Sequence, residues 1–324
     1  MTAIPLGKRL RRGIRSALIR SAVAVLSFLP LGPALALGGL GGRLAWRLSP
    51  RSRRLALAHL AVAFPGLPEE ERGRIARECF EHLGRSAMEV TAVRAVDARL
   101  DAYVSFAGDG ERLLHQALSR GRGMVFVTGH LGNWELMARR VGRSGIPNVV
   151  VAKAGADRGL NALAERFRAS GGVTTLWRED PGAGRAIIRT FREGKALGLL
   201  IDQDTKVQGV FVPFFGWPAF TPRAAADLAL RFRAPVVVAT THRRGPRPGD
   251  GHLVEVTEVS CNPDAPDREA EVVRLTAACT HILEEAIRRS PAEWVWMHQR
   301  WKTRPPEADE QARAMPKNRG LSGD

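Results

Sequence analysis

Apolar and polar residues alternate in blocks of two kinds along residues 124–243. Short apolar runs, four of them rich in valine, are typical of buried strands, and five occur here: "MVFVT", "NVVVA", "ALGLLID", "VFVPFF" and "PVVVAT". Between them lie helix-type patterns that begin near Trp134, Asp157, Gly184 and Pro222. This alternation predicts an α/β fold with a mixed, mostly parallel sheet flanked by helices.

Helical patterns also flank this region. Upstream, "RRLALAHLAVAFPGLPEEERGRIARECFEHLGRSAMEV" indicates two helices joined by a Pro-Gly turn. Glu69, Glu70 and Glu71 would lie in the first turn of the second helix, where the helix dipole favours acidic residues. Downstream, the pattern predicts a long helix over about residues 268–290.

The N-terminal region carries much of the positive charge. Through Pro68 the chain has eleven Lys or Arg residues and no Asp or Glu, against a net charge of +16 for all 324 residues. Basic residues that flank an apolar run favour an anionic membrane surface. Nucleic acid is disfavoured as a partner because zinc-finger spacing and an aromatic RNA-binding signature are both missing, and only 6% of residues are aromatic.

The longest uncharged apolar run, Ser21 to Gly42, has three interpretations. A signal peptide fits weakly, with "ALA" at 34–36 as its cleavage site. A single spanning helix is just long enough. However, "LPLGPALALGGLGG" contains two prolines and five glycines, which should break a helix near the middle of the run. We therefore favour two short helices that dip into the cytoplasmic leaflet.

These patterns divide the chain into three parts. Residues 1–48 form a basic, apolar membrane-anchoring segment, residues 49–305 form the main domain, and residues 306–324 form a polar tail that we expect to be disordered. A hydrophobic content of 44% is ample for a core. The three cysteines are far apart and predict neither a zinc cage nor a disulfide framework.

The first strand runs into "GHLGNWE", the stretch with the most distinctive chemistry. Reactive groups in α/β sheets gather where strands end. Asn133 is a good N-cap, so the helix should start at Trp134 and place Glu135 in its first turn. Residues five apart on a helix face away from each other. We therefore expect His130 in a loop past the strand, where Gly132 and Asn133 allow its imidazole to hydrogen-bond the Glu135 carboxylate as a general base.

A structural histidine and a metal ligand are the alternatives for His130. The flanking glycines, the preceding buried strand and the acid five residues on favour catalysis over a purely structural role. The HExxH spacing of zinc proteases is missing. Asp202 and Asp204 end another buried strand and are candidate site residues, but two acids one residue apart are too common to indicate a cation. We expect neither a metal nor a cofactor.

His130 and Glu135 match the HX4(D/E) motif of glycerolipid acyltransferases, and the surrounding residues resemble the late acyltransferases of lipid A biosynthesis. Three further blocks are similar to that family, in order over residues 50–305: "RRLALAHLAVAFPGLPEEER", "LLIDQDTKVQGVFVPFFGWPAFTP" and "EWVWMHQRWKTRP". A bare HX4E is weak evidence, whereas four ordered blocks are specific.

The resemblance implies transfer of a fatty acyl chain from a thioester, usually that of acyl carrier protein, to a hydroxyl of a membrane glycolipid such as a lipid A precursor. His130 would be the base and Glu135 its orienting partner. The family's functional arginine maps onto Arg166 or Arg168, and its acid maps onto Asp202. Together with Asn133 and Asp204, these are the candidate substrate-binding residues.

Alternatives to this function remain. Thr205 to Gln208 departs from the Tyr-Gly often found after the acidic motif in lipid A enzymes, which leaves the acceptor open. The protein could acylate another glycolipid or a lysophospholipid from acyl-CoA, or it could be a membrane lipid-binding protein that does no chemistry. The expected location is the cytoplasmic face of the inner membrane.

Overall fold

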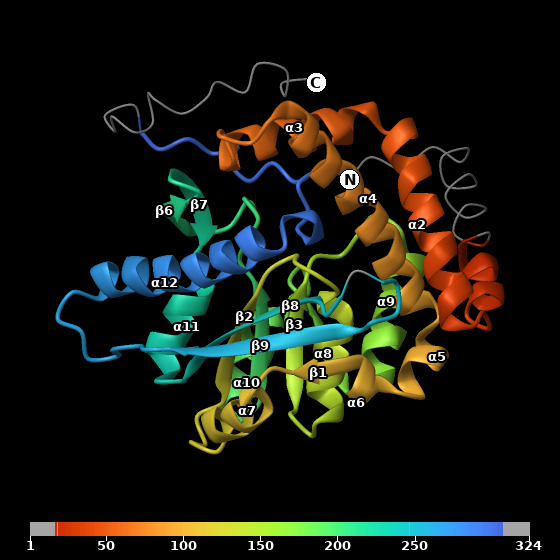
Figure 1. Cartoon of the computed structure of the whole chain (residues 1–324). Helices are drawn as coiled ribbons and strands as arrows, with labels where there is room; N and C mark the ends of the chain where they lie inside the picture. Colours follow the sequence, from red (N-terminus) through yellow and green to blue (C-terminus); the bar gives the residue numbers. More distant parts are fainter. Residues whose placement is uncertain (1–16, 18, 246, 307–324) are drawn as a thin grey trace, which may run out of the picture.

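The computed structural model describes residues 17, 19–245 and 247–306 (Figure 1). A seven-stranded sheet has the order β1-β9-β8-β2-β5-β3-β4, and every neighbouring pair is parallel except β8 with β9. This confirms the predicted mixed, mostly parallel sheet. The strands are β1 Val104–Phe106, β2 Met124–Thr128, β3 Asn148–Ala152, β4 Val173–Trp177, β5 Ala196–Leu200, β8 Val236–Arg243 and β9 His252–Val259.

Helices cover both faces of the sheet because alternate residues of each strand point to opposite sides. In β2, Val125 and Val127 pack in one core cluster with residues of α10, α11 and α12, whereas Met124 and Phe126 pack in a second cluster with α7 and α8. These helices are α7 Gly110–Leu118, α8 Trp134–Arg143, α10 Ala183–Arg192, α11 Ala224–Phe232 and α12 Arg268–Arg289. The two clusters make a three-layer core around β2.

Four of the five predicted strands belong to this sheet. The fifth, "VFVPFF", is a strand in β6 Gly209–Phe214, but β6 pairs only with β7 Trp217–Pro222 in a separate antiparallel hairpin. Strands β1, β4, β7 and β9 were not predicted. β4, at the sheet edge, reads "VTTLW", and β9 reads "HLVEVTEV". Polar residues interrupt both strands, so neither presents the continuous apolar run used to recognise strands.

Two helices and the C-terminal segment cover the end of the sheet where the parallel strands finish. The predicted helix pair is present as α3 Pro50–Ala63 and α4 Glu69–Thr91. Their apolar faces pack in one cluster with Trp294, Trp296 and Trp301. Short helices α5 Val93–Asp97 and α6 Leu100–Tyr103 follow α4, and α9 Arg158–Ser170 precedes β4. Residues 307–324 of the expected tail lie outside the described residues.

The N-terminal run contains two helical segments, as expected, with a break at residues 27–30. Residues 19–26 are helical, and α2 spans Leu31–Leu48. The four glycines at 38–42 do not break α2, contrary to our expectation. A Cβ at Gly38 would lie 2.5 Å from the Gly84 carbonyl oxygen, and one at Gly42 would lie 2.2 Å from that of Phe80. These glycines let α2 approach α4 backbone to backbone.

The opposite face of α2 is apolar and exposed. Its large side chains recur at helical spacing, with exposed fractions of 43% to 71%: Leu37, Leu40, Leu44 and Leu48. Val25 and Phe28, just before α2, are exposed by 72% and 71%. Within the described part of the chain, no helix has both the length and the apolarity needed to cross a bilayer.

The glycine contact between α2 and α4 can be tested with a matched pair of substitutions. Gly42→Ala should lower the thermal unfolding temperature, because overpacking costs about 1–3 kcal/mol. A Cβ at Gly41, one residue away, would have no neighbour within 4 Å. Gly41→Ala should therefore be neutral or stabilising by up to about 1 kcal/mol through helix propensity. Equal melting temperatures for the two variants, measured by circular dichroism, would contradict the close approach.

Candidate active site

Strand register brings His130 next to Asp202. In the parallel pair β2 and β5, Thr128 lies opposite Leu200, and the Ile201 amide continues the pairing by donating to the Thr128 carbonyl at 3.2 Å. Each strand then runs two residues further, to His130 and to Asp202. Two residues that are 72 positions apart in sequence therefore meet at the carboxyl end of the sheet, where ligand sites of α/β proteins form.

The Asp202 carboxylate accepts three hydrogen bonds. His130 donates from Nδ1 to Oδ1 at 2.8 Å and from its backbone amide to Oδ2 at 2.6 Å, and Trp294 donates from Nε1 to Oδ2 at 2.7 Å. Gly129 makes room for this arrangement, since a Cβ there would lie 3.0 Å from Oδ2. A carboxylate only accepts, so the Nδ1 of His130 carries a proton and Nε2 presents its lone pair.

The electrostatics suit a general base. Burial raises the pKa of Asp202, but electrostatic attraction to the His130 ring and the hydrogen bonds from His130 and Trp294 outweigh burial and hold the pKa at about 2. Asp202 is thus ionised at neutral pH. The His130 side chain remains 23% exposed, so a substrate can reach it, whereas that of Asp202 is 1% exposed. The His130 and Trp134 rings pack edge to face at a centroid distance of 5.0 Å.

Glu135 does not contact His130, and our expectation of a His130–Glu135 hydrogen bond is wrong. The loop geometry itself is confirmed: His130 precedes the helix, α8 begins at Trp134, and Gly132 has a φ of +62°. However, the turn directs Glu135 toward Arg168 on α9, with Nε to Oε2 at 2.9 Å and Nη2 to Oε1 at 2.5 Å. The orienting partner of His130 is Asp202.

The same contact distinguishes the two candidate arginines. Although burial opposes its charge, pairing with Glu135 raises the pKa of Arg168, which stays a cation. Arg166 lies exposed on the same helix. The ion pair joins the start of α8 to α9, and Arg168 is the arginine that the structure connects to the motif.

Asn133 and Asp204 bond within the protein. Asn133 is 3% exposed and caps α8 as expected, accepting from the Leu136 amide at 3.2 Å, while its Nδ2 donates to Glu89 at 2.8 Å. Asp204 accepts from the backbone amide and the hydroxyl of Thr303, at 2.6 and 3.0 Å. Neither residue contacts His130. No group of three or more potential metal-ligating residues occurs among the residues that the structure describes.

A cavity opens beside Asp204 at the same end of the sheet. Its volume is about 470 Å³. Two exposed lysines, Lys206 and Lys302, line it together with Phe220 and Thr303. The cavity is therefore partly apolar and positively charged, which suits an anionic amphiphile.

The C-terminal segment holds the loop of His130, a role that the sequence did not reveal. Leu131 forms a β-bridge with Trp294. The Gly132 amide donates to the Glu293 carbonyl at 3.0 Å, and the Val295 amide donates to the His130 carbonyl at 3.2 Å. The block "EWVWMHQRWKTRP" carries these residues, but the hydrogen bonds are made by its backbone and by one indole, so no spacing in the sequence announces them.

The fold and the site define an α/β protein in which a partly exposed histidine bonds to a buried carboxylate where two central parallel strands end. Comparison with known proteins gives the family. The chain belongs to the bacterial lipid A biosynthesis acyltransferases, whose family model matches residues 8–303, and it is an acyltransferase.

Curated relatives agree with this family. The chain is similar to the lipid A biosynthesis lauroyltransferase of Escherichia coli K12, with 26% identity over 82% of this chain and 83% of the relative. It is also similar to a lipid A biosynthesis acyltransferase of Haemophilus influenzae, with 27% identity over 82% and 83%. The palmitoleoyltransferase of E. coli K12 is 25% identical over 83% and 85%.

The role of Asp202 can be tested with Asp202→Asn. The amide oxygen would face the two N–H donors at the Oδ2 position, which turns the amide nitrogen toward Nδ1 of His130. The proton would then move to Nε2 and the base would be lost, so kcat should fall by on the order of 10⁴-fold. Asp97→Asn, which weakens the ion pair of Asp97 with Arg139 and touches neither His130 nor Asp202, is the control and should keep its kcat. A kcat above one-tenth of the wild-type value in Asp202→Asn would contradict this role.

Proposed function

We propose that this acyltransferase moves a fatty acyl chain from a thioester of acyl carrier protein to a hydroxyl group of a lipid A precursor. The observation that carries the proposal is the His130–Asp202 pair, whose Nε2 is available to take a proton. The family supports lipid A as the acceptor, since the relatives are lipid A acyltransferases. The basic cavity beside Asp204 is consistent with an anionic lipid head group.

In the proposed reaction, His130 and Asp202 are the only residues needed to move the proton. Nε2 of His130 removes the proton of the acceptor hydroxyl as the oxygen attacks the thioester carbonyl carbon, forming a C–O bond and a tetrahedral oxyanion. Asp202 stabilises the imidazolium through Nδ1. Collapse of the oxyanion breaks the C–S bond, and the imidazolium returns the proton to the departing thiolate. The products are the ester and the free thiol.

The contribution of Glu135 and Arg168 is indirect in this proposal. Their side chains are 21% and 15% exposed and bond to each other at the start of α8, next to Trp134, whose ring contacts His130. We infer that the ion pair fixes α8 against α9 and so supports the histidine loop.

The reaction can be tested with purified protein, a lauroyl thioester and an under-acylated lipid A precursor. Mass spectrometry should show one added acyl chain with the wild-type protein and none above background with His130→Ala. The thioester of acyl carrier protein should exceed that of coenzyme A in kcat/KM by about tenfold or more, a difference of about 1.4 kcal/mol in transition-state binding.

Other outcomes separate the alternatives. Equal rates with both thioesters, together with faster acylation of a lysophospholipid, would favour the acyl-CoA function. Absence of turnover with every acceptor, while vesicles are still bound, would favour a non-catalytic lipid-binding protein. A lipid profile that is unchanged in a deletion strain would argue against lipid A as the acceptor in the cell.

The exposed face of α2 supports attachment to the cytoplasmic face of the inner membrane. Leucines at 37, 40, 44 and 48 face outward, and the exposed Arg43 and Arg47 are interspersed with them. Such a helix can lie in the interface with its leucines among acyl chains and its arginines at anionic head groups. We infer that this face, together with Val25 and Phe28, seats the enzyme beside its lipid acceptor.

Substitution tests this attachment better than deletion of residues 1–48 does, because deletion would also remove the packing of α2 on α4. Leu40→Ser with Leu44→Ser and Leu48→Ser should reduce sedimentation with vesicles that contain anionic lipid, while the melting temperature stays nearly unchanged. High salt should release little of the wild-type protein, since apolar insertion is not screened. Complete release of the wild-type protein by salt would contradict insertion.

A further inference from the structure

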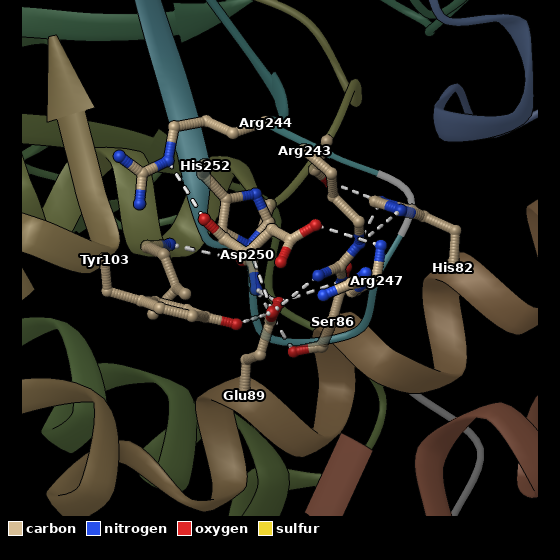
Figure 2. Close-up of polar contacts among 12 residues, drawn as sticks. His82, Ser86, Glu89, Tyr103, Arg243, Arg244, Arg247, Asp250 and His252 are labelled. Carbon is tan, nitrogen blue, oxygen red and sulfur yellow. Dashed lines mark hydrogen bonds and ion pairs between the residues drawn. The ribbon is translucent and has the colours of Figure 1, made fainter. Parts of the chain in front are cut away.

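A buried carboxylate lies behind the histidine loop. Glu89 of α4 is 0% exposed and accepts hydrogen bonds from four side chains. Tyr103 donates its hydroxyl at 2.6 Å, Asn133 its amide at 2.8 Å, and Arg243 two nitrogens at 2.8 and 3.1 Å, while Nε2 of His252 lies 3.0 Å away. Figure 2 shows Tyr103, Arg243 and His252 converging on Glu89 from three different elements.

Arg243 connects Glu89 to His82. Its Nε lies 3.2 Å from Nδ1 of His82, as the dashed line in Figure 2 shows. Because a guanidinium only donates, Nδ1 must accept, and the proton of the neutral ring is on Nε2. Burial, together with the Arg243 charge, lowers the pKa of His82 to about 3, so the ring is neutral.

His82 in turn holds the loop. Its Nε2 lies 3.1 Å from the carbonyl oxygen of Gly132, which can only accept. A row of hydrogen bonds therefore runs from the Glu89 carboxylate through the Arg243 guanidinium and the His82 imidazole to the backbone at Gly132. Gly132 also lies close against β8, because a Cβ there would lie 2.1 Å from the Thr241 carbonyl oxygen.

Two further contacts attach the same cluster to the loop. Asn133 bonds Glu89 with Nδ2 and caps α8 with Oδ1. The backbone amide of Arg243 donates to both carboxylate oxygens of Glu293 at 3.1 Å, and the carbonyl of Glu293 accepts from the Gly132 amide. Both polar backbone groups of Gly132, two positions from His130, are thus held. His82 bonds the carbonyl, and Glu293, which is bonded to Arg243, accepts from the amide. We call Glu89, Arg243, His82, Asn133 and Glu293 the Glu89 cluster.

The stability of the fold does not by itself explain why Glu89 and Arg243 are buried as charged groups. A buried ion pair is often no more stabilising than apolar residues of the same volume, because desolvation offsets the attraction. A planar guanidinium between a carboxylate and an imidazole does, however, fix direction as well as distance. We propose that Glu89, Arg243 and His82 are positioning residues that hold the loop at Gly132 so that His130 meets the acceptor hydroxyl. This inference rests on His130 as the base.

The first test uses His82, the group that touches the loop. His82→Leu removes the donor to Gly132, and kcat should fall by about 10- to 100-fold, the scale of a misplaced catalytic group. The KM for the lauroyl carrier-protein thioester and for the lipid A precursor should stay within about twofold, because binding is not the step affected. His82→Gln can still donate from its amide and should recover part of the lost kcat.

A second test separates positioning from folding. Glu89→Gln leaves Arg243 buried without its counter-charge and should lower the melting temperature sharply. Adding Arg243→Met removes that charge, so the double variant should regain much of its melting temperature while its kcat remains low. Glu271→Gln is the matched control: Glu271 is a 6% exposed helix glutamate that pairs with Arg274 and accepts from the Asn262 amide. It should lose stability and keep its kcat.

The outcomes are distinct. If kcat of the double variant recovers along with its melting temperature, or if His82→Leu keeps more than half of the wild-type kcat, the positioning role is wrong. If wild-type protein and His130→Ala turn over equally, the proposed function itself fails. That outcome is independent of the His82, Glu89 and Arg243 variants. A rise in KM with kcat unchanged would identify the cluster as part of a binding surface and would also overturn the inference.

Discussion

The site depends on a buried negative charge at Asp202. Placing a carboxylate in a protein interior costs several kcal/mol unless hydrogen bonds and an opposite charge compensate for the lost water. Here the backbone and ring of His130 and the indole of Trp294 provide that compensation. The carboxylate therefore requires that β2, β5 and the C-terminal segment all be in place, and the His130 ring is held in this orientation only in the complete fold.

A second buried charge, Glu89, lies on the other side of the same loop. Asp202 contacts the histidine directly, whereas Glu89 reaches the loop through Arg243, His82 and Asn133. The loop between β2 and α8 is thus fixed from two sides by ionised groups in a low-dielectric interior, where hydrogen bonds are strong and misplacement is costly.

The N-terminal helix combines two requirements on opposite faces. Glycines allow α2 to lie against the α4 backbone, and α4 also carries Glu89 and His82. The leucine face of α2 points outward. Helix α4 therefore joins the face proposed to contact the membrane to the residues proposed to position His130. The proposed membrane surface and the candidate active site are held in a fixed relation as a result.

The sequence by itself determined the local structure. Apolar runs predicted β2, β3, β5 and β8, Asn133 predicted the start of α8, and the motif at His130 together with three further blocks predicted the family. These features depend on residues close together in the chain, where periodicity and capping act.

The sequence did not determine which acid faces His130. Glu135 was the nearer candidate, but the register of β2 against β5 brought Asp202 to the ring and left Glu135 to Arg168. Likewise, the glycines of α2 suggested a broken helix but instead allow close packing against α4. The sequence could not show this, because the effect of a glycine depends on which residues lie beside it. Pairing across 72 residues and contact between helices are decided by tertiary packing, since no local pattern encodes them.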